Sequence, residues 1–289
     1  LNQTSHSISL DAASSLFKDG FVFTSTASGV FKTSLSTMET TQVSSHLTRG
    51  LFLLSSGGIL ASTNLFRSGL TYRSDDNGEN WVESSAQGLH YAEYDGTIYA
   101  SAILLKAFKS VDDGVTWTRL PGWNRYSGKL CVNQNNGDLY MGPNSFSSGA
   151  RWEVSTDGGD TFSNTGLVSS GYVRDCFINT NDDVYVTTGD TLSRKTASGS
   201  NYETLLTNTD VYGGTAIGNL VSVYVDSNGY IYAGTSSDTD DHKLLISTDN
   251  GATFIHYDIA SNVMDIDVDE STGKIYLTTQ DHGLIILSP

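Results

Sequence analysis

This chain repeats four times the pattern of Ser247-Thr248-Asp249-Asn250-Gly251-Ala252-Thr253-Phe254, with Asp at +2 from Ser, Gly at +4 and an aromatic residue at +7. The four copies are Ser74, Asp76, Gly78 and Trp81; Ser110, Asp112, Gly114 and Trp117; Ser155, Asp157, Gly159 and Phe162; and Ser247, Asp249, Gly251 and Phe254. The Asp carboxylate can accept hydrogen bonds from backbone amides of its own turn, and Gly can take a positive φ. We therefore predict four tight turns between strands, in which these residues are structural and neither catalytic nor metal-binding.

The pattern resembles the Asp-box (BNR) repeat of sialidases, sortilin-type receptors, xyloglucanases and photosystem assembly factors. Those proteins are β-propellers, so the resemblance implies a propeller with the box at the periphery of each blade, away from the functional face. The repeats that carry this resemblance extend over nearly the whole chain. In size, the chain is closest to single-domain seven-bladed members of that family.

A second repeat gives the number of blades. Turn residues followed by an alternating apolar strand occur near positions 20, 57, 96, 137, 182, 229 and 273, in steps of 37 to 47 residues. That period is typical of a four-stranded propeller blade, and the alternation excludes helical repeats. We predict an all-β, seven-bladed β-propeller with four-stranded antiparallel blades, forming one domain over residues 1–289.

The last unit reaches its third strand at Leu284 to Leu287, and the chain stops at Pro289. We expect Thr4 to Leu10 to supply the missing outer strand, which closes the ring and removes an exposed sheet edge. The first residue is Leu1, which fits either a processed secreted protein or a trimmed chain.

The composition restricts the possible partners. The net charge is −16, from 32 acidic and 16 basic residues, and such an acidic field opposes nucleic acids and anionic lipids. No apolar run is long enough to insert into a membrane. The run from Asp238 to His242 has oxygen ligands for Ca²⁺ but lacks the EF-hand pattern, so we favour a solvated acidic loop. We expect an extracellular or cell-surface protein without metal or cofactor, and the oligomeric state stays open.

The two cysteines test the alignment of the blades. Cys131 and Cys176 each precede the Tyr of the next strand, Tyr140 and Tyr185, by nine residues. Equal spacing indicates the same register on neighbouring inner strands, where the side chains would point the same way and lie too far apart for a disulfide. We therefore predict two free, buried thiols.

Functional residues of a propeller are expected in the loops from each second to third strand and from each fourth strand to the next blade. Those loops are residues 64–68, 121–129, 143–151, 166–175, 209–219, 235–242 and 280–282. Within them, Trp123, Arg125 and Tyr126, with Tyr172 and Arg174 from the following blade, combine aromatic rings with hydrogen-bond donors, as ligand sites often do. The alternatives are a core position for Trp123 and an ordinary ion pair between Arg174 and Asp175.

The resemblance to sialidases implies an arginine triad, a Tyr nucleophile with a Glu behind it, and an Arg-Ile-Pro or Arg-Leu-Pro motif in the first blade. Residues 12–42 contain no Arg, and Arg119-Leu120-Pro121 falls in the third blade instead. Xyloglucanase-like hydrolases would need a second propeller. The prediction is therefore a non-enzymatic binding or scaffold propeller that recognises a glycan or a protein at the channel face. The alternative is a glycoside hydrolase of sialidase-like or related type; no catalytic residue is assigned.

Overall fold

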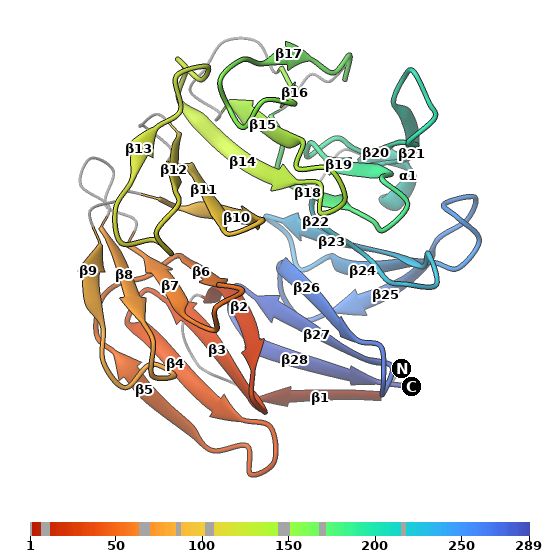
Figure 1. Ribbon diagram of the computed structural model, residues 1–289. Coiled ribbons are helices and arrows are strands. Elements are labelled where there is room, and N and C mark those ends of the chain that lie inside the picture. Colours follow the sequence, from red (N-terminus) through yellow and green to blue (C-terminus); the bar gives the residue numbers. More distant parts are fainter. Residues whose placement is uncertain are drawn as a thin grey trace.

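The computed structural model describes residues 2–6, 12–63, 70–84, 88–101, 107–143, 151–167, 172–214 and 218–289. These residues form seven four-stranded antiparallel sheets, arranged as blades around a central axis (Figure 1). This confirms the predicted all-β, seven-bladed β-propeller. A single helical turn, α1 (Asn208–Val211), is the one α-helix in the described part, where no helix could span a membrane.

Each blade runs from an innermost to an outermost strand. Blade one has β2 (Ala12–Lys18), β3 (Phe21–Thr26), β4 (Gly29–Ser34) and β5 (Thr40–Ser44); blade two has β6 (Gly50–Leu53), β7 (Ile59–Ser62), β8 (Thr71–Ser74) and β9 (Val82–Ser84); blade three has β10 (His90–Tyr94), β11 (Thr97–Ser101), β12 (Phe108–Ser110) and β13 (Thr118–Arg119); blade four has β14 (Ser127–Val132), β15 (Leu139–Pro143), β16 (Glu153–Ser155) and β17 (Ser163–Asn164). Blade five has β18 (Asp175–Ile178), β19 (Val184–Thr187), β20 (Thr191–Lys195) and β21 (Glu203–Thr207); blade six has β22 (Gly218–Val225), β23 (Ile231–Ser237), β24 (His242–Ser247) and β25 (Ile255–Ile259); blade seven has β26 (Val263–Asp269), β27 (Lys274–Thr279), β28 (Gly283–Ser288) and, outermost, β1 (Asn2–His6).

The ring is closed by the N-terminal strand, as predicted. β1 pairs antiparallel with β28, with Asn2 opposite Ser288 and His6 opposite Leu284. The two ends of the chain therefore lie side by side (Figure 1). The expected closing segment was Thr4 to Leu10; the strand begins earlier, and residues 7–10 lie outside the described residues.

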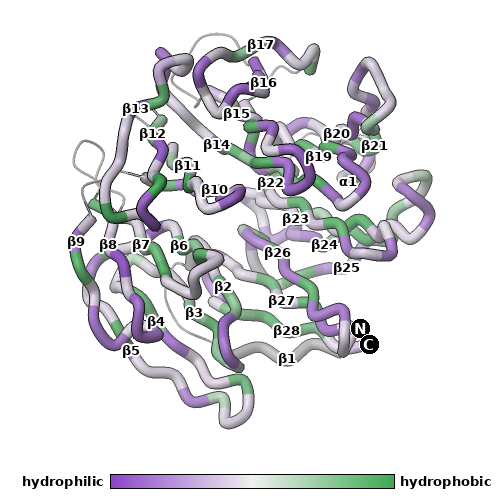
Figure 2. Tube along the Cα trace, viewed as in Figure 1, coloured by the Kyte–Doolittle hydropathy of each residue, from purple (hydrophilic) through white to green (hydrophobic). Residues whose placement is uncertain are grey.

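Apolar side chains fill the spaces between neighbouring blades. Blades six and seven, for example, share a core that contains Leu244, Val263, Leu277 and Ile285, all buried. Figure 2 shows the hydrophobic residues gathered along strands such as β23 and β28, with hydrophilic residues in many of the connecting turns. Because each blade buries one face against the next, the core is a ring of contacts between sheets.

The four repeated turns share one hydrogen-bond pattern. In the copy that starts at Ser247, the Ser hydroxyl donates to Asp249 at 2.8 Å, and the Gly251 amide donates to the Ser oxygen at 2.8 Å. The backbone amide of Thr253 donates to the same carboxylate at 2.9 Å. Hydrogen bonds from the Thr253 side chain and backbone lower the pKa of Asp249 to about 2. Gly251 has a φ of 85°, which explains why the pattern requires glycine at this place.

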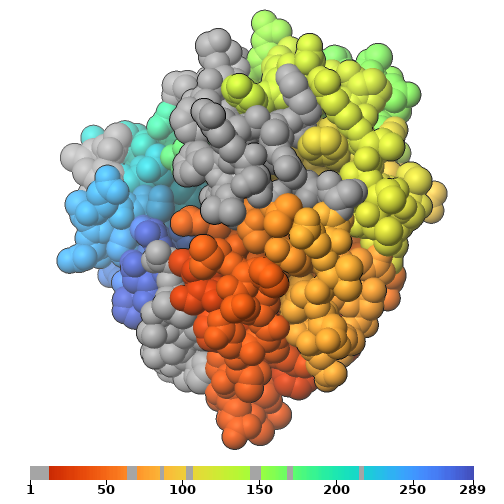
Figure 3. Space-filling model, turned by 90° about the vertical axis from the view of Figure 1, so that its left-hand side faces the viewer, coloured from red at the N-terminus to blue at the C-terminus, as the bar shows by residue number. Residues whose placement is uncertain are grey.

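A basic residue joins each of these turns to the blade before it. In the third strand of each preceding blade, a Lys or Arg donates to a backbone carbonyl of the turn in the next blade, three residues after its Ser. The pairs are Lys32 to Asn77 (3.2 Å), Arg73 to Asp113, Lys109 to Gly158 (3.1 Å) and Arg194 to Asn250 (3.1 Å). Where the next blade lacks the turn, the equivalent position is apolar: Val154, Ile246 and Ile286. The basic residue and the turn therefore act as one clasp between adjacent blades, which pack closely on the outer surface (Figure 3).

Replacing Arg194 with Met should reduce the free energy of unfolding by about 1–3 kcal/mol, because it removes charge-assisted hydrogen bonds. The Arg194 side chain is only 9% exposed and also pairs with Glu203 at 2.6 Å. Urea denaturation would measure the loss. The matched control is Lys195→Met, on the opposite face of the same strand, which should change stability by much less; equal losses in the two variants would contradict the clasp.

The prediction of two free thiols is wrong. Cys131 and Cys176 form a disulfide, with their Cα atoms 6.2 Å apart. Cys131 pairs across the sheet with Tyr140, whereas Cys176 pairs with Val186 and it is Phe177 that pairs with Tyr185. The turn after β18 is one residue shorter than the turn after β14, so Cys176 lies one residue out of register. A shift of one residue reverses the face of a strand, and the two side chains therefore point toward each other between the blades.

Candidate functional site

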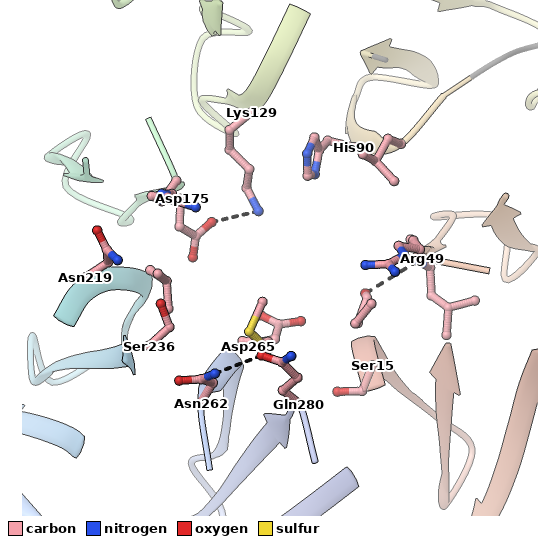
Figure 4. Close-up of a pocket in the computed structure, with 18 of the residues that line it drawn as sticks. Ser15, Arg49, His90, Lys129, Asp175, Asn219, Ser236, Asn262, Asp265 and Gln280 are labelled. Atoms are coloured by element: carbon pink, nitrogen blue, oxygen red, sulfur yellow. Dashed lines mark hydrogen bonds and ion pairs between the residues drawn. The ribbon is translucent and has the colours of Figure 1, made fainter. Parts of the chain in front are cut away.

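A pocket of about 650 Å³ lies on the axis of the ring, at the ends where the innermost strands begin. All seven blades line it (Figure 4). One polar or charged residue from each blade, in chain order, is Ser15, Arg49, His90, Lys129, Asp175, Asn219 and Asp265. The loops that follow β23 and β27 add Asp238 and Gln280. The pocket thus lies where residues of the loops 166–175, 209–219, 235–242 and 280–282 come together.

Bulges in the inner strands direct side chains into this pocket. The register of pairing shifts in four blades, between Ala12 and Ser14, Ser127 and Leu130, Leu220 and Ser222, and Val263 and Asp265. Four residues within these irregular stretches, Ala13, Lys129, Val221 and Met264, line the pocket. A bulge adds a residue to one strand and redirects its side chain, which is why bulges often lie beside functional sites.

An ion pair forms one wall of the pocket. Lys129 and Asp175, from the adjacent strands β14 and β18, lie 2.7 Å apart. The Asp175 carboxylate also accepts hydrogen bonds from the backbone amides of Cys176 and Val223, each at 2.9 Å. Both oxygens are therefore occupied, and the carboxylate links blades four, five and six. Cys131 follows Lys129 by two residues and Cys176 follows Asp175 directly, so the disulfide joins the same two strands as the ion pair.

Asp265 is a second carboxyl group in the pocket. Figure 4 places it between the Lys129–Asp175 ion pair and the hydrogen-bonded side chains of Asn262 and Gln280. Burial raises the pKa of Asp265 to about 7; Lys129 lowers it in part, and Asp175 raises it further. For Lys129, burial opposes the charge, but the attraction of Asp175 and Asp265 outweighs it and the pKa is raised.

His90 completes the titratable cluster. Burial, followed by repulsion from Lys129, lowers the pKa of His90 to about 3. The imidazole is therefore neutral at neutral pH. It can donate or accept a hydrogen bond without adding charge to the pocket.

Asp265→Asn should stabilise the protein at pH 8 by about 2–4 kcal/mol and have little effect at pH 4. The pKa of Asp265 is higher in the folded than in the unfolded state, so folding takes up a proton between about pH 4 and 7. The stability of the native protein therefore loses this contribution as the pH rises through that window. Asn does not titrate, and the stability difference between variant and native protein should grow with pH.

Denaturation curves at several pH values would measure this difference in the free energy of unfolding. The lowered pKa of His90 affects the pH dependence in the opposite direction, but it does so in both proteins and therefore cancels in the difference. The exposed Asp240→Asn is the control and should show no such growth. A difference that stays constant from pH 4 to 8 would mean that Asp265 is not desolvated.

Three of the predicted ligand residues lie outside the pocket. Trp123 is 1% exposed and packs edge-on against Phe162 at 5.1 Å, so its ring is a core residue and is not accessible to a ligand. Arg125 forms an ion pair with Glu153 at 2.6 Å. Tyr126 is 45% exposed, and neither residue lines the pocket.

The other two predicted residues are closer to the site. Arg174 lines the pocket, and its guanidinium carbon lies 4.4 Å from the centre of the Tyr172 ring. The alternative pairing of Arg174 with Asp175 is not observed, because Asp175 pairs with Lys129. None of the residues of the four repeated turns lines the pocket.

Within the predicted loops, residues 64–68, 144–150, 168–171 and 215–217 lie outside the described part of the chain. In the acidic run that was weighed as a Ca²⁺ site, Asp241 pairs with Lys243 at 2.6 Å. The described residues contain no group of three His, Cys, Asp or Glu side chains arranged for a metal ion.

Sequence reasoning missed Arg49, His90 and Asp265. All three lie within the first three residues of an inner strand or directly before it. Aligning the seven inner strands and selecting the polar positions near their starts would have found them. None of the three lies in the predicted loops.

No protein-family model and no curated protein matches this chain. Among solved structures, the extracellular domain of BT4673 from B. thetaiotaomicron has a TM-score of 0.74 at 15% identity, over 96% of this chain and 38% of that one. The GH74 xyloglucanase from Xanthomonas campestris has a TM-score of 0.77 at 12% identity, over 98% and 53%. YCF48 bound to D1 peptide has a TM-score of 0.75 at 12% identity, over 100% and 94%.

The chain thus spans well under two thirds of the first two proteins and nearly all of YCF48. At these identities the likeness shows a shared seven-bladed propeller fold. Function has to be argued from the pocket itself.

Proposed function

We propose that this protein is a non-enzymatic, extracellular or cell-surface binding module that holds a glycan or a segment of another protein in the channel pocket. The observation that carries the proposal is the pocket of about 650 Å³, to which every blade contributes. Its size falls in the range of ordinary ligand sites, and its polar groups converge on one space.

The walls of this pocket are pre-organised. The inner strands are hydrogen-bonded within their sheets, and a disulfide and the Lys129–Asp175 ion pair join blades four and five beside the pocket. A rigid site loses little conformational entropy when a ligand binds, which favours affinity. Propellers of similar structure also agree with a binding role: one is an extracellular domain, and another has been solved with a bound peptide.

One observation favours a glycoside hydrolase as the second candidate. Asp265 has a pKa of about 7, as a general acid requires, and Asp175 is a second carboxyl group in the same pocket. However, both oxygens of Asp175 already accept hydrogen bonds or pair with Lys129. A nucleophile or general base needs a free oxygen, so we place binding first.

The test combines a glycan array, a library of peptides and a panel of fluorogenic glycosides with the purified chain. We expect saturable binding without turnover. Ser236→Tyr should block binding, because Ser236 faces the pocket and a phenol ring would occupy its space. The control is Lys274→Gln, at the exposed first position of β27 and outside the pocket. Hydrolysis that disappears in Asp265→Asn would establish the second candidate instead, and binding that Ser236→Tyr leaves intact would place the site elsewhere.

A further inference from the structure

We infer that the ligand of the channel pocket carries a carboxylate group and is an acidic sugar of the uronic-acid type. This inference rests on the proposed binding function and deepens it. It follows from two features of the pocket: arginines that lack a carboxylate partner, and a wall of amide and hydroxyl groups.

The charges of the pocket differ from those of the whole chain. The chain has 32 acidic and 16 basic residues. The pocket has three of each: Arg49, Lys129 and Arg174 against Asp175, Asp238 and Asp265. Lys129 and Asp175 neutralise each other in their ion pair. Since the surrounding protein is strongly acidic, the basic groups in the channel stand out as candidates for an anionic ligand.

Arg49 and Arg174 have no acidic partner of their own. Within the described residues, neither guanidinium forms an ion pair, whereas Arg73, Arg125 and Arg194 each do. The Nε atom of Arg174 is buried and has no hydrogen-bond acceptor among those residues. A buried donor without an acceptor costs free energy, and a carboxylate is the acceptor that guanidinium groups bind best.

Basic groups lie on both sides of the pocket, since Arg174 of blade five lies near Asn219 and across the ring from Arg49 of blade two. Figure 4 shows Arg49, His90 and Lys129 along one side, and the side chains of Asn219, Ser236, Asn262 and Gln280 along the other. A ligand that spans the pocket therefore meets Arg49 and Lys129 at one side, and Arg174 together with the hydrogen-bonding groups at the other.

The amide wall is fixed in place. Asn262 donates to the Gln280 side-chain oxygen at 2.8 Å and accepts from the Ser237 amide at 2.7 Å. These bonds orient the Gln280 amide and leave its NH₂ group as a donor. Met264, which is 38% exposed, adds an apolar surface to the same side. Oriented amides, hydroxyls and a small apolar patch match the hydroxyl groups and ring face of a sugar.

A protein ligand fits these features less well. Protein interfaces obtain most of their affinity from aromatic or aliphatic anchors that fill apolar pockets. Most of the side chains that line this pocket are instead charged, amide or hydroxyl groups, and the apolar ones, such as Leu51, Leu89 and Val221, are the minority. We therefore favour the sugar and treat an acidic peptide as an outcome of the test.

The experiment compares ligands that differ only at one carbon. Isothermal titration would measure the binding of galacturonate and galactose oligomers, and of glucuronate and glucose oligomers, of equal length and linkage. We expect at least one acidic sugar to bind about tenfold more tightly than its neutral counterpart, with a loss of affinity in high salt.

Charge variants give opposite expectations. Arg49→Gln and Arg174→Gln should each weaken the acidic ligand about tenfold and leave the neutral one unchanged. Asp265→Asn should strengthen the acidic ligand, because it removes a negative charge that faces the basic side. Lys274→Gln, which removes a charge outside the pocket, should have no effect. A purely structural role of these residues would not produce changes of opposite sign.

Three outcomes would overturn the inference. Equal binding of acidic and neutral sugars would refute the carboxylate and leave the proposed function intact. Binding of an acidic peptide but no sugar would refute the sugar and favour a protein ligand. If no sugar and no peptide binds, the proposed function itself fails.

Discussion

Deletion of residues 1–6 should lower the melting temperature by about 10 °C or more. This segment contains β1, which supplies the outermost strand of blade seven. Without it, the backbone groups of β28 lose their partners and the strand becomes an exposed edge. The buried residues Leu284 and Ile286 pack with Val22 of blade one, so the damage extends to the contact between the first and last blades.

Circular dichroism on heating would measure the change, and size-exclusion chromatography would show whether the new edge causes association. A synthetic peptide of residues 1–6, added in excess, should restore part of the lost stability. A melting curve that the deletion leaves unchanged would show that β1 does not close the ring.

Loss of the disulfide should be nearly as damaging. Replacing Cys131 and Cys176 by Ser is expected to reduce the free energy of unfolding by about 4 kcal/mol, because the bond closes a loop with a sequence separation of 45 residues and restricts the unfolded chain. Urea denaturation of the oxidised, reduced and doubly substituted protein would measure it. The reduced native protein and the double variant should behave alike.

Intact-mass measurement after alkylation supplies the check on this bond. The native protein should take up no alkylating reagent unless it is first reduced. Two reactive thiols in the folded, unreduced protein would contradict the observed register of β14 and β18, on which the pairing of the cysteines depends.

Much of the architecture could be predicted because it depends on short sequence patterns within each blade. Turn residues recur at the blade period, and alternating apolar residues fill the strands, so the number and type of the blades followed from spacing alone. The repeated turn is equally local: Asp249 binds groups within six residues of itself. The closing strand also followed, from simple counting of the strands in each unit.

Three features depended on contacts that spacing does not encode. Cys131 and Cys176 share a spacing but not a register, because one turn is shorter by a residue, and one residue decides which face a side chain occupies. Trp123 lies in a loop by sequence, yet the packing of Phe162 buries it. Arg49, His90 and Asp265 are far apart in the chain, and only ring closure brings them to one pocket.

The repeating unit, the number of blades and the turns could therefore be predicted from local spacing, since these depend mainly on interactions within a blade. The tertiary structure decided the disulfide, the clasps between blades and the site. Those features arise where residues from different blades meet, at positions set by strand register and by bulges. Six of the seven blades form from one continuous stretch of chain each, whereas the pocket forms from residues near the starts of all seven inner strands.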